Sequence, residues 1–84
     1  MRIILLPHAK QQLFERGINS NEIKNVLQKA DQIIDGGFKG RKIAQKIIMK
    51  SKKKFLYRVI FKLQGSYYTV ITAYRTSKIK KYLT

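Results

Sequence analysis

The sequence predicts an α+β domain in which a short N-terminal strand and two helices pack on a twisted antiparallel sheet. Two changes of pattern lead to this prediction. Between Pro7 and Ala30 the apolar residues recur at helical spacing, whereas from Asp31 onward they alternate with polar residues as in strands. Because the 84 residues contain neither a linker nor an internal repeat, we expect residues 1–84 to form one domain.

The N-terminal third carries local signals for a strand and two helices. Residues 3–6 form a short β-type run that ends at Pro7, and proline is favoured in the first turn of a helix. Gly17 stands where glycine commonly ends a helix. Asn19 and Glu22 have the spacing of a capping box for a second helix. The apolar face of that helix consists of Ile23, Val26, Leu27 and Ala30.

The remainder of the chain alternates like a series of strands. We expect strands at residues 31–35, 41–50, 54–63 and 67–75, with a loop at 36–40 and a turn at 51–54. The two residues Gly65 and Ser66 fit the tight turn of a hairpin. The basic segment 76–83 is expected to be a tail or a short helix that begins at Thr76 or Ser77.

The Gly65-Ser66 turn predicts the pairing of the last two strands. If Gln64 pairs with Tyr67, an unbroken ladder follows along both strands. It places opposite each other Lys62 and Thr69, Ile60 and Ile71, Arg58 and Ala73, and Leu56 and Arg75. These residues would form a shallow basic trough. The core face under the helices would carry Phe55, Tyr57, Val59, Phe61, Leu63, Tyr68, Val70, Thr72 and Tyr74.

Charge is strongly segregated along the chain. Residues 1–35 carry five basic and four acidic side chains, whereas residues 36–84 carry fourteen basic side chains and no acid, which makes the net charge +15. A surface of this kind attracts phosphate backbones or acidic proteins. A membrane surface is disfavoured because the sequence contains no strongly amphipathic basic helix and no apolar run near the ~20 residues of a bilayer span. We therefore expect a cytoplasmic protein.

The residue types argue against most catalytic chemistries. One histidine and four dispersed acids are a poor supply for a hydrolytic metal site or for the paired carboxylates of a glycosidase. The GGFKG segment lacks the ending of a phosphate-binding loop. We therefore expect neither a metal ion nor a cofactor. Metal-independent RNA cleavage fits the composition, because the 2′-hydroxyl of RNA is the nucleophile and Arg, Lys, Tyr and His can do the rest.

Four segments resemble a small domain family related to the RelE and BrnT toxins. The similarity lies in HAKQQLFERGI, GRKIAQK, LYRVIF and VITAYRTSKIKKY, which together span most of the chain. The resemblance implies a RelE-like fold and, by analogy, a metal-independent ribonuclease of a toxin–antitoxin pair. It implies Arg58 as the phosphate-stabilising arginine, and Arg75 and Tyr82 as catalytic residues. The family usually has arginine where this chain has Gln12, which weakens the case for a charged pocket on the first helix.

Several candidate site residues also have a structural interpretation. His8 at the start of the first helix is either a general base or a residue that bonds the strand below it. Tyr74 and Thr72 fall in the inward pattern and are expected in the core. Tyr82 is either catalytic or the packed end of a short helix. The residues expected to bind RNA are Arg16, Arg41, Lys46, Lys62, Lys78 and Lys81.

The expected function is that of a metal-independent endoribonuclease toxin. Its substrate would be RNA, such as ribosome-bound mRNA, and an acidic antitoxin would cover the basic face. The expected catalytic residues are Arg58, Arg75, His8 and Tyr82. Two alternatives stay open: a non-catalytic RNA- or DNA-binding module, and an interaction domain for an acidic partner protein.

Overall fold

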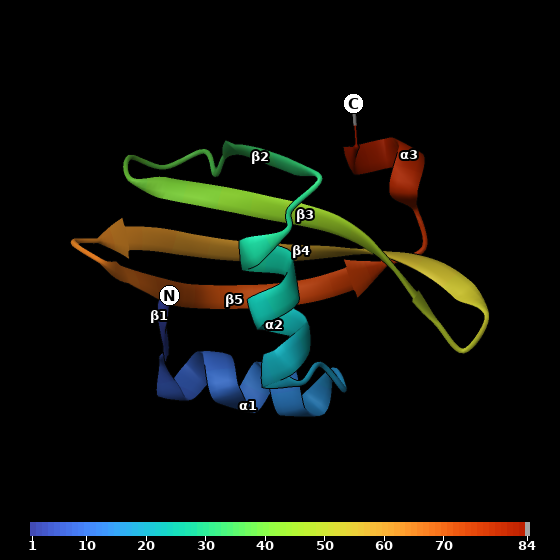
Figure 1. Cartoon of the computed structure of the whole chain (residues 1–84), viewed down its shortest axis with the longest axis horizontal. Coiled ribbons are helices and arrows are strands. Elements are labelled where there is room, and N and C mark those ends of the chain that lie inside the picture. The colour runs from blue at the N-terminus through green and yellow to red at the C-terminus, as the bar shows by residue number, and fades with distance from the viewer. Residues whose placement is uncertain (84) are drawn as a thin grey trace.

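The fold consists of one sheet with two helices on one side, and a short helix ends the described part of the chain (Figure 1). The computed structural model describes residues 1–83, so Thr84, the last residue of the predicted domain, lies outside the described range. In chain order the elements are β1 (Arg2–Leu5), α1 (Pro7–Glu15), α2 (Ser20–Gln28), β2 (Gln32–Asp35), β3 (Arg41–Lys50), β4 (Lys53–Gln64), β5 (Tyr67–Thr76) and α3 (Ile79–Tyr82). The predicted α+β class is confirmed.

The five strands have the order β1-β5-β4-β3-β2. Strands β2 to β5 form an antiparallel meander. Strand β1, however, pairs in parallel with residues 67–70 of β5. The sheet is therefore mixed, and the prediction of an antiparallel sheet is wrong at this edge. The reason is that α1 and α2 carry the chain away from β1, so that β1 can join the last strand in the same direction.

The two N-terminal helices have the predicted boundaries to within a few residues. Gly17 follows α1 with a φ of +66°, a left-handed conformation that glycine adopts readily. The capping box of α2 is present: the Glu22 amide donates to Asn19 Oδ1 at 2.8 Å, and the Asn19 amide donates to Glu22 Oε1 at 3.0 Å. These bonds satisfy amides at the helix start that have no partner within the helix.

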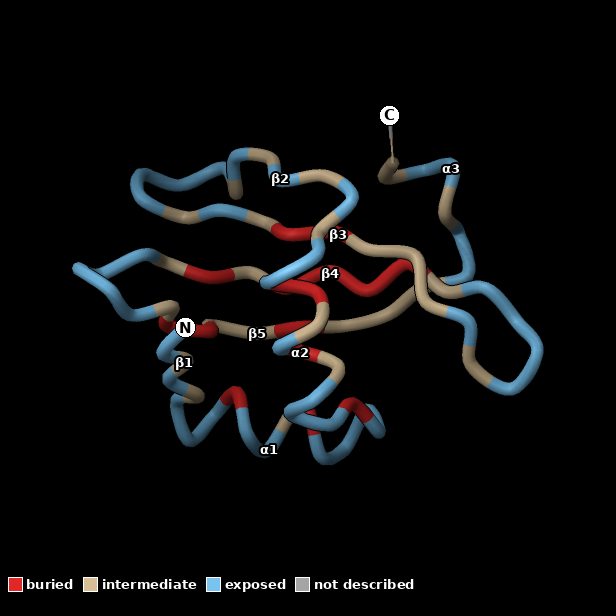
Figure 2. The backbone as a smooth tube through the Cα atoms, viewed as in Figure 1, coloured by how far each residue is buried: buried red, intermediate tan, exposed pale blue. Residues whose placement is uncertain are grey.

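The core lies between the sheet and these helices. Helix α2 packs against β3 and β4, and α1 packs against β5. Figure 2 shows the buried segments in the middle of β3, β4 and β5 and at the parts of α1 and α2 that lie near the sheet. The buried cluster comprises Leu13, Ile18, Ile23, Val26, Leu27, Ala44, Tyr57, Val59, Phe61, Val70 and Ala73. The helical periodicity had predicted the α2 members of this cluster.

The pairing of β4 with β5 contains a β-bulge. It begins in the predicted register at the Gly65-Ser66 turn, but shifts by one residue between Ile60 and Phe61. Phe61 pairs with Val70 and Ile60 with Thr72, so Ile71 is the extra residue.

The bulge reverses the predicted faces for the rest of β5, because side chains alternate along a strand. Ala73 pairs with Val59 and is 1% exposed in the core, while Tyr74 pairs with Arg58 on the opposite face. Arg75 pairs with Tyr57 on the core side. The predicted register is wrong from Ile60 onward, as are the core positions predicted for Thr72 and Tyr74.

Truncation of Ile23 tests the helix–sheet core. Its side chain is 1% exposed, so Ile23→Ala should lower the free energy of unfolding by about 2–5 kcal/mol through lost burial and a cavity. Urea denaturation followed by circular dichroism measures the change. Phe14→Ala is the control, because Phe14 is 87% exposed and its loss should change stability by no more than about 0.5 kcal/mol. Equal effects of the two substitutions would contradict this packing.

Candidate functional site

The two faces of the sheet differ in charge compensation. We call the side that carries Ala44, Tyr57 and Val59 the helix face, because α2 packs there. We call the opposite side, which carries Gln45 and Arg58, the far face. Acidic side chains pair with lysines on the first of these faces but not on the second.

On the helix face, three lysines of β3 each meet an acid. The pairs are Lys42–Asp35 at 3.3 Å, Lys46–Asp31 at 3.8 Å and Lys50–Glu22 at 3.5 Å. The fourth acid of the chain, Glu15, accepts a hydrogen bond from Gln11 within α1 at 3.2 Å. All four carboxylates therefore have partners away from the far face.

Arg58 lies in the middle of the far face and is 9% exposed. It sits between Gln45 of β3 and Tyr74 of β5. Its Nε donates to Gln45 Oε1 at 2.6 Å, and its Nη1 donates to the Tyr74 hydroxyl at 2.5 Å. The guanidinium carbon lies 4.2 Å from the centroid of the Tyr82 ring, a cation–π contact. Within residues 1–83, the groups that contact the Arg58 cation are thus all neutral.

The groups around Arg58 are themselves fixed. Gln45 is fully buried, and its Nε2 donates to Gln32 Oε1 at 3.0 Å and to the Tyr82 carbonyl at 3.4 Å. The Tyr74 and Tyr82 rings meet edge to face with centroids 6.4 Å apart. Helix α3 is therefore held against the far face, and the orientation of the guanidinium is set before any ligand arrives.

One nitrogen of Arg58 remains available. Its Nη2 makes no hydrogen bond within residues 1–83, and no buried side-chain nitrogen or oxygen in that range lacks a partner, so Nη2 reaches solvent. A charge removed from water without a counter-ion is costly. An anion that accepts from Nη2 would offset this cost, and a guanidinium is suited to phosphate.

Arg75 belongs to a different group of side chains, on the helix face. Its Nη1 lies 3.4 Å from both the Tyr57 hydroxyl and the Gly17 carbonyl oxygen. The Tyr57 hydroxyl in turn donates to Glu22 Oε2 at 2.6 Å. The two arginines that the resemblance places in one site therefore lie on opposite faces of the sheet.

The carboxylate and the phenol in this group have shifted pKa values. Burial raises the pKa of Tyr57, and its hydrogen bond to Glu22 adds to this effect, while Arg75 opposes it. Burial alone would also raise the pKa of Glu22. Hydrogen bonds from Tyr57 and the Asn19 amide, together with the charge of Lys50, outweigh that effect, so the pKa of Glu22 lies below its ordinary value.

Two predicted site residues of the N-terminal region do not reach Arg58. His8 is exposed on α1 and makes no side-chain hydrogen bond or ion pair with any other part of residues 1–83. Arg16 donates through Nη1 to the Ala73 carbonyl at 2.7 Å and to Thr72 Oγ1 at 3.2 Å. Arg16 thereby covers the part of the β5 edge that β1 leaves open.

The predicted RNA-binding residues of the strands and tail are divided between the two faces. Lys46 is on the helix face, paired with Asp31. Arg41 and Lys62 are register partners on the far face. Lys81 lies at α3, with its Nζ 5.3 Å from the centroid of the Tyr82 ring, and Lys78 precedes that helix.

Arg58 and Tyr82 were identified from the sequence as site residues, but Gln45 and Tyr74, which contact both of them, were not. Gln45 was missed, although an amide in the middle of the apolar alternation of RKIAQKIIMK is a usable signal for a buried polar contact. Tyr74 was assigned to the wrong face because nothing in the sequence marks the bulge.

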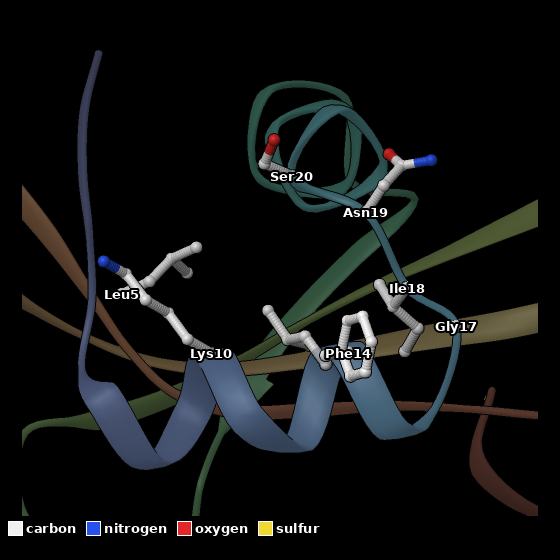
Figure 3. Close-up of a pocket in the computed structure, with 8 residues that line it drawn as sticks. Leu5, Lys10, Phe14, Gly17, Ile18, Asn19 and Ser20 are labelled. Carbon is white, nitrogen blue, oxygen red and sulfur yellow. The ribbon is translucent and has the colours of Figure 1, made fainter.

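A groove on the other side of the molecule lacks the features of a reactive site. It has a volume of about 440 Å³ and lies between α1 and the start of α2, with Leu5, Phe14 and Ile18 in its wall (Figure 3). Lys10 is its charged residue.

In the described part of the chain, no group of three or more His, Asp or Glu side chains is arranged to hold a metal ion. No helix within residues 1–83 meets the length and hydropathy required to cross a bilayer.

Glu22→Gln tests the group on the helix face through pH. A carboxyl group whose pKa is lowered by folding stabilises the folded state above its unfolded value, near 4.5, and this stabilisation disappears as the pH falls through the folded pKa. We therefore expect the free energy of unfolding to fall more steeply below about pH 4.5 in the wild type than in Glu22→Gln. Urea denaturation at a series of pH values measures this. Glu15→Gln, on the exposed side of α1, is the control, and identical slopes for wild type and Glu22→Gln would contradict the assignment.

Comparison with known proteins places the chain in a family. Residues 5–75, most of its length, match the family described as Domain of unknown function (DUF4258). No curated protein and no solved structure matches the chain. Because this match covers most of the sequence, the chain belongs to the DUF4258 family.

Proposed function

We propose that the protein is a metal-independent endoribonuclease that binds RNA on the far face, with Arg58 at the scissile phosphate. One observation carries the proposal. Arg58 is a buried cation in the centre of the sheet, and its contacts are the neutral groups of Gln45, Tyr74 and Tyr82. A phosphate oxygen bound at Nη2 would supply the negative charge that none of the four acidic side chains provides there.

The charge around Arg58 supports a polyanionic ligand. Arg41 and Lys62 lie on the same face, and Lys78 and Lys81 lie at α3. None of the four acidic side chains opposes them, because each is engaged elsewhere. Binding should therefore weaken with salt, by roughly 0.7 log units per log unit of salt for each phosphate contacted on a single strand.

The proposed reaction uses the nucleophile that RNA contains. The 2′-oxygen attacks the neighbouring phosphorus, the bond from phosphorus to the 5′-oxygen breaks, and the products are a 2′,3′-cyclic phosphate and a 5′-hydroxyl. A base removes the 2′-proton and an acid protonates the 5′-oxygen. Arg58 stabilises the negative charge that develops on the phosphate oxygens. Tyr82, which lies over the guanidinium, is the residue we assign to proton transfer.

The biological setting is proposed from the sequence resemblance to RelE and BrnT toxins. In that setting the protein is the toxin of a toxin–antitoxin pair and acts on mRNA, free or ribosome-bound. An acidic antitoxin would complement the uncompensated charge of the far face, and such complementarity speeds association.

A non-catalytic RNA-binding module is the second candidate. It is favoured by the positions of His8 and Arg75, which lie away from Arg58 and leave tyrosines as the nearest groups for proton transfer. The same far face would then bind RNA without cleaving it.

Cleavage of a defined mRNA in EDTA, with and without ribosomes, tests the proposal. The wild type should cut. Arg58→Lys keeps the charge but loses the planar fork, and should cut about 100-fold more slowly or worse, the usual loss when a transition-state donor is removed. Tyr82→Phe keeps the ring over Arg58 and should bind RNA normally. Because it lacks the hydroxyl, its cleavage rate should fall by about 100-fold or more.

Lys24→Ala, which removes a positive charge from the exposed side of α2, should cut like the wild type. Thermal unfolding of each variant separates a lost site from a lost fold. Intact RNA in every lane, together with salt-sensitive binding that Arg58→Lys weakens, would establish the binding module instead. Cleavage by folded Arg58→Lys at the wild-type rate would exclude the binding module and overturn the placement of Arg58 at the scissile phosphate.

A further inference from the structure

The loop between β2 and β3 presents an aromatic ring that folding does not use. The Gly36 amide donates to the Arg41 carbonyl at 2.9 Å, and the Arg41 amide donates to the Phe38 carbonyl at 3.0 Å, so the loop is a closed turn. Gly37 and Gly40 have φ values of +82° and +78°, which favour glycine on either side of the exposed segment. Phe38 at its tip is 69% exposed.

One cation holds the Phe38 ring. The guanidinium carbon of Arg41 lies 4.9 Å from the ring centroid. This cation–π contact restrains the ring while most of its surface stays in water. A restrained, solvent-exposed aromatic ring next to an arginine has the components with which proteins stack the bases of single-stranded nucleic acids.

This ring stands at the end of a basic line that leads to Arg58. Arg41 pairs with Lys62 across β3 and β4, and Lys62 and Arg58 lie on the same face of β4, four residues apart. At about 3.3 Å per residue, the distance along the strand is about 13 Å. The nearby acid Asp35 is bonded to Lys42 on the helix face and does not interrupt the line.

We infer that Phe38 is a base-stacking subsite for single-stranded RNA, beyond Lys62 and Arg41 on the basic line that leads from the phosphate held by Arg58. The inference rests on the proposed function and adds to it a class of substrate. Only an unpaired base offers a free ring face to Phe38, so double-stranded RNA would not use the subsite. Because phenylalanine has no hydrogen-bonding group, the subsite accepts any base.

Binding of a short, uncleavable RNA tests the subsite. We would titrate each variant against a fluorescent eight-nucleotide RNA whose 2′-hydroxyls are replaced by fluorine, and follow anisotropy. Phe38→Ala should weaken binding about five- to 100-fold, the range that removal of a stacking aromatic produces. Phe38→Tyr should bind like the wild type. Phe14→Ala removes a phenylalanine of α1 that is even more exposed than Phe38 and should also bind like the wild type.

Abasic substitution at each position of the oligonucleotide identifies the stacked base. For the wild type, removing the base at one position should lower the affinity about as much as the Phe38→Ala substitution does. For Phe38→Ala, removing the base at that same position should leave the affinity unchanged. Unchanged affinity of Phe38→Ala, or equal sensitivity of both proteins at every position, would overturn the subsite.

Two far-face variants separate this result from failure of the proposed function. Arg58→Gln and Lys62→Ala should each weaken binding, and Lys62→Ala serves if Arg58→Gln does not fold. If these variants bind weakly while Phe38→Ala binds normally, the stacking subsite is overturned but RNA binding on the far face is not. Normal binding by folded Arg58→Gln and by Lys62→Ala would overturn RNA binding on the far face itself.

Discussion

One extra residue in β5, Ile71, determines which side chains meet on each face of the sheet. Without it, Ala73 would stand beside Arg58, and a methyl group cannot accept a hydrogen bond. With it, Tyr74 occupies that place and its hydroxyl accepts from Arg58. The same shift turns Arg75 toward Tyr57 and Gly17 on the helix face. Bulges commonly re-aim side chains in this way, and here the arrangement of the proposed site depends on one.

Folding, and not sequence proximity, determines where the acidic side chains lie on the sheet. All four precede residue 36, yet folding brings Asp31, Asp35 and Glu22 to three lysines of β3 on the helix face. Ion pairs as exposed as Lys42–Asp35 add little stability individually. Their larger consequence is electrostatic, since they offset three positive charges on the helix face, whereas no acidic side chain offsets the charge of the far face.

Features with local causes could be predicted from the sequence. The α2 cap depends on Asn19 and Glu22 alone, and the hairpin register near Gly65 depends on a two-residue turn. The bulge could not be predicted, because Val70, Ile71 and Thr72 are all β-branched and no glycine or proline marks the irregularity.

Non-local contacts escaped prediction for a related reason. The parallel pairing of β1 joins the two ends of the chain, and no short pattern encodes that contact. Of the proposed site, Arg58 and Tyr82 were identified by resemblance. The role of Gln45 and the separation of Arg75 from Arg58 emerge only when three strands and α3 are assembled.

The most direct test of the account is to locate bound RNA by nuclear magnetic resonance. Uncleavable single-stranded RNA would be titrated into ¹⁵N-labelled protein while the backbone amides and the Arg58 Nε–H signal are followed. We expect the Arg58 Nε–H signal and the amides near Arg41, Lys62 and α3 to shift, while those of α2 do not. Shifts confined to α1 and α2, with the Arg58 signal unchanged, would contradict the claim that the far face is the RNA-binding surface.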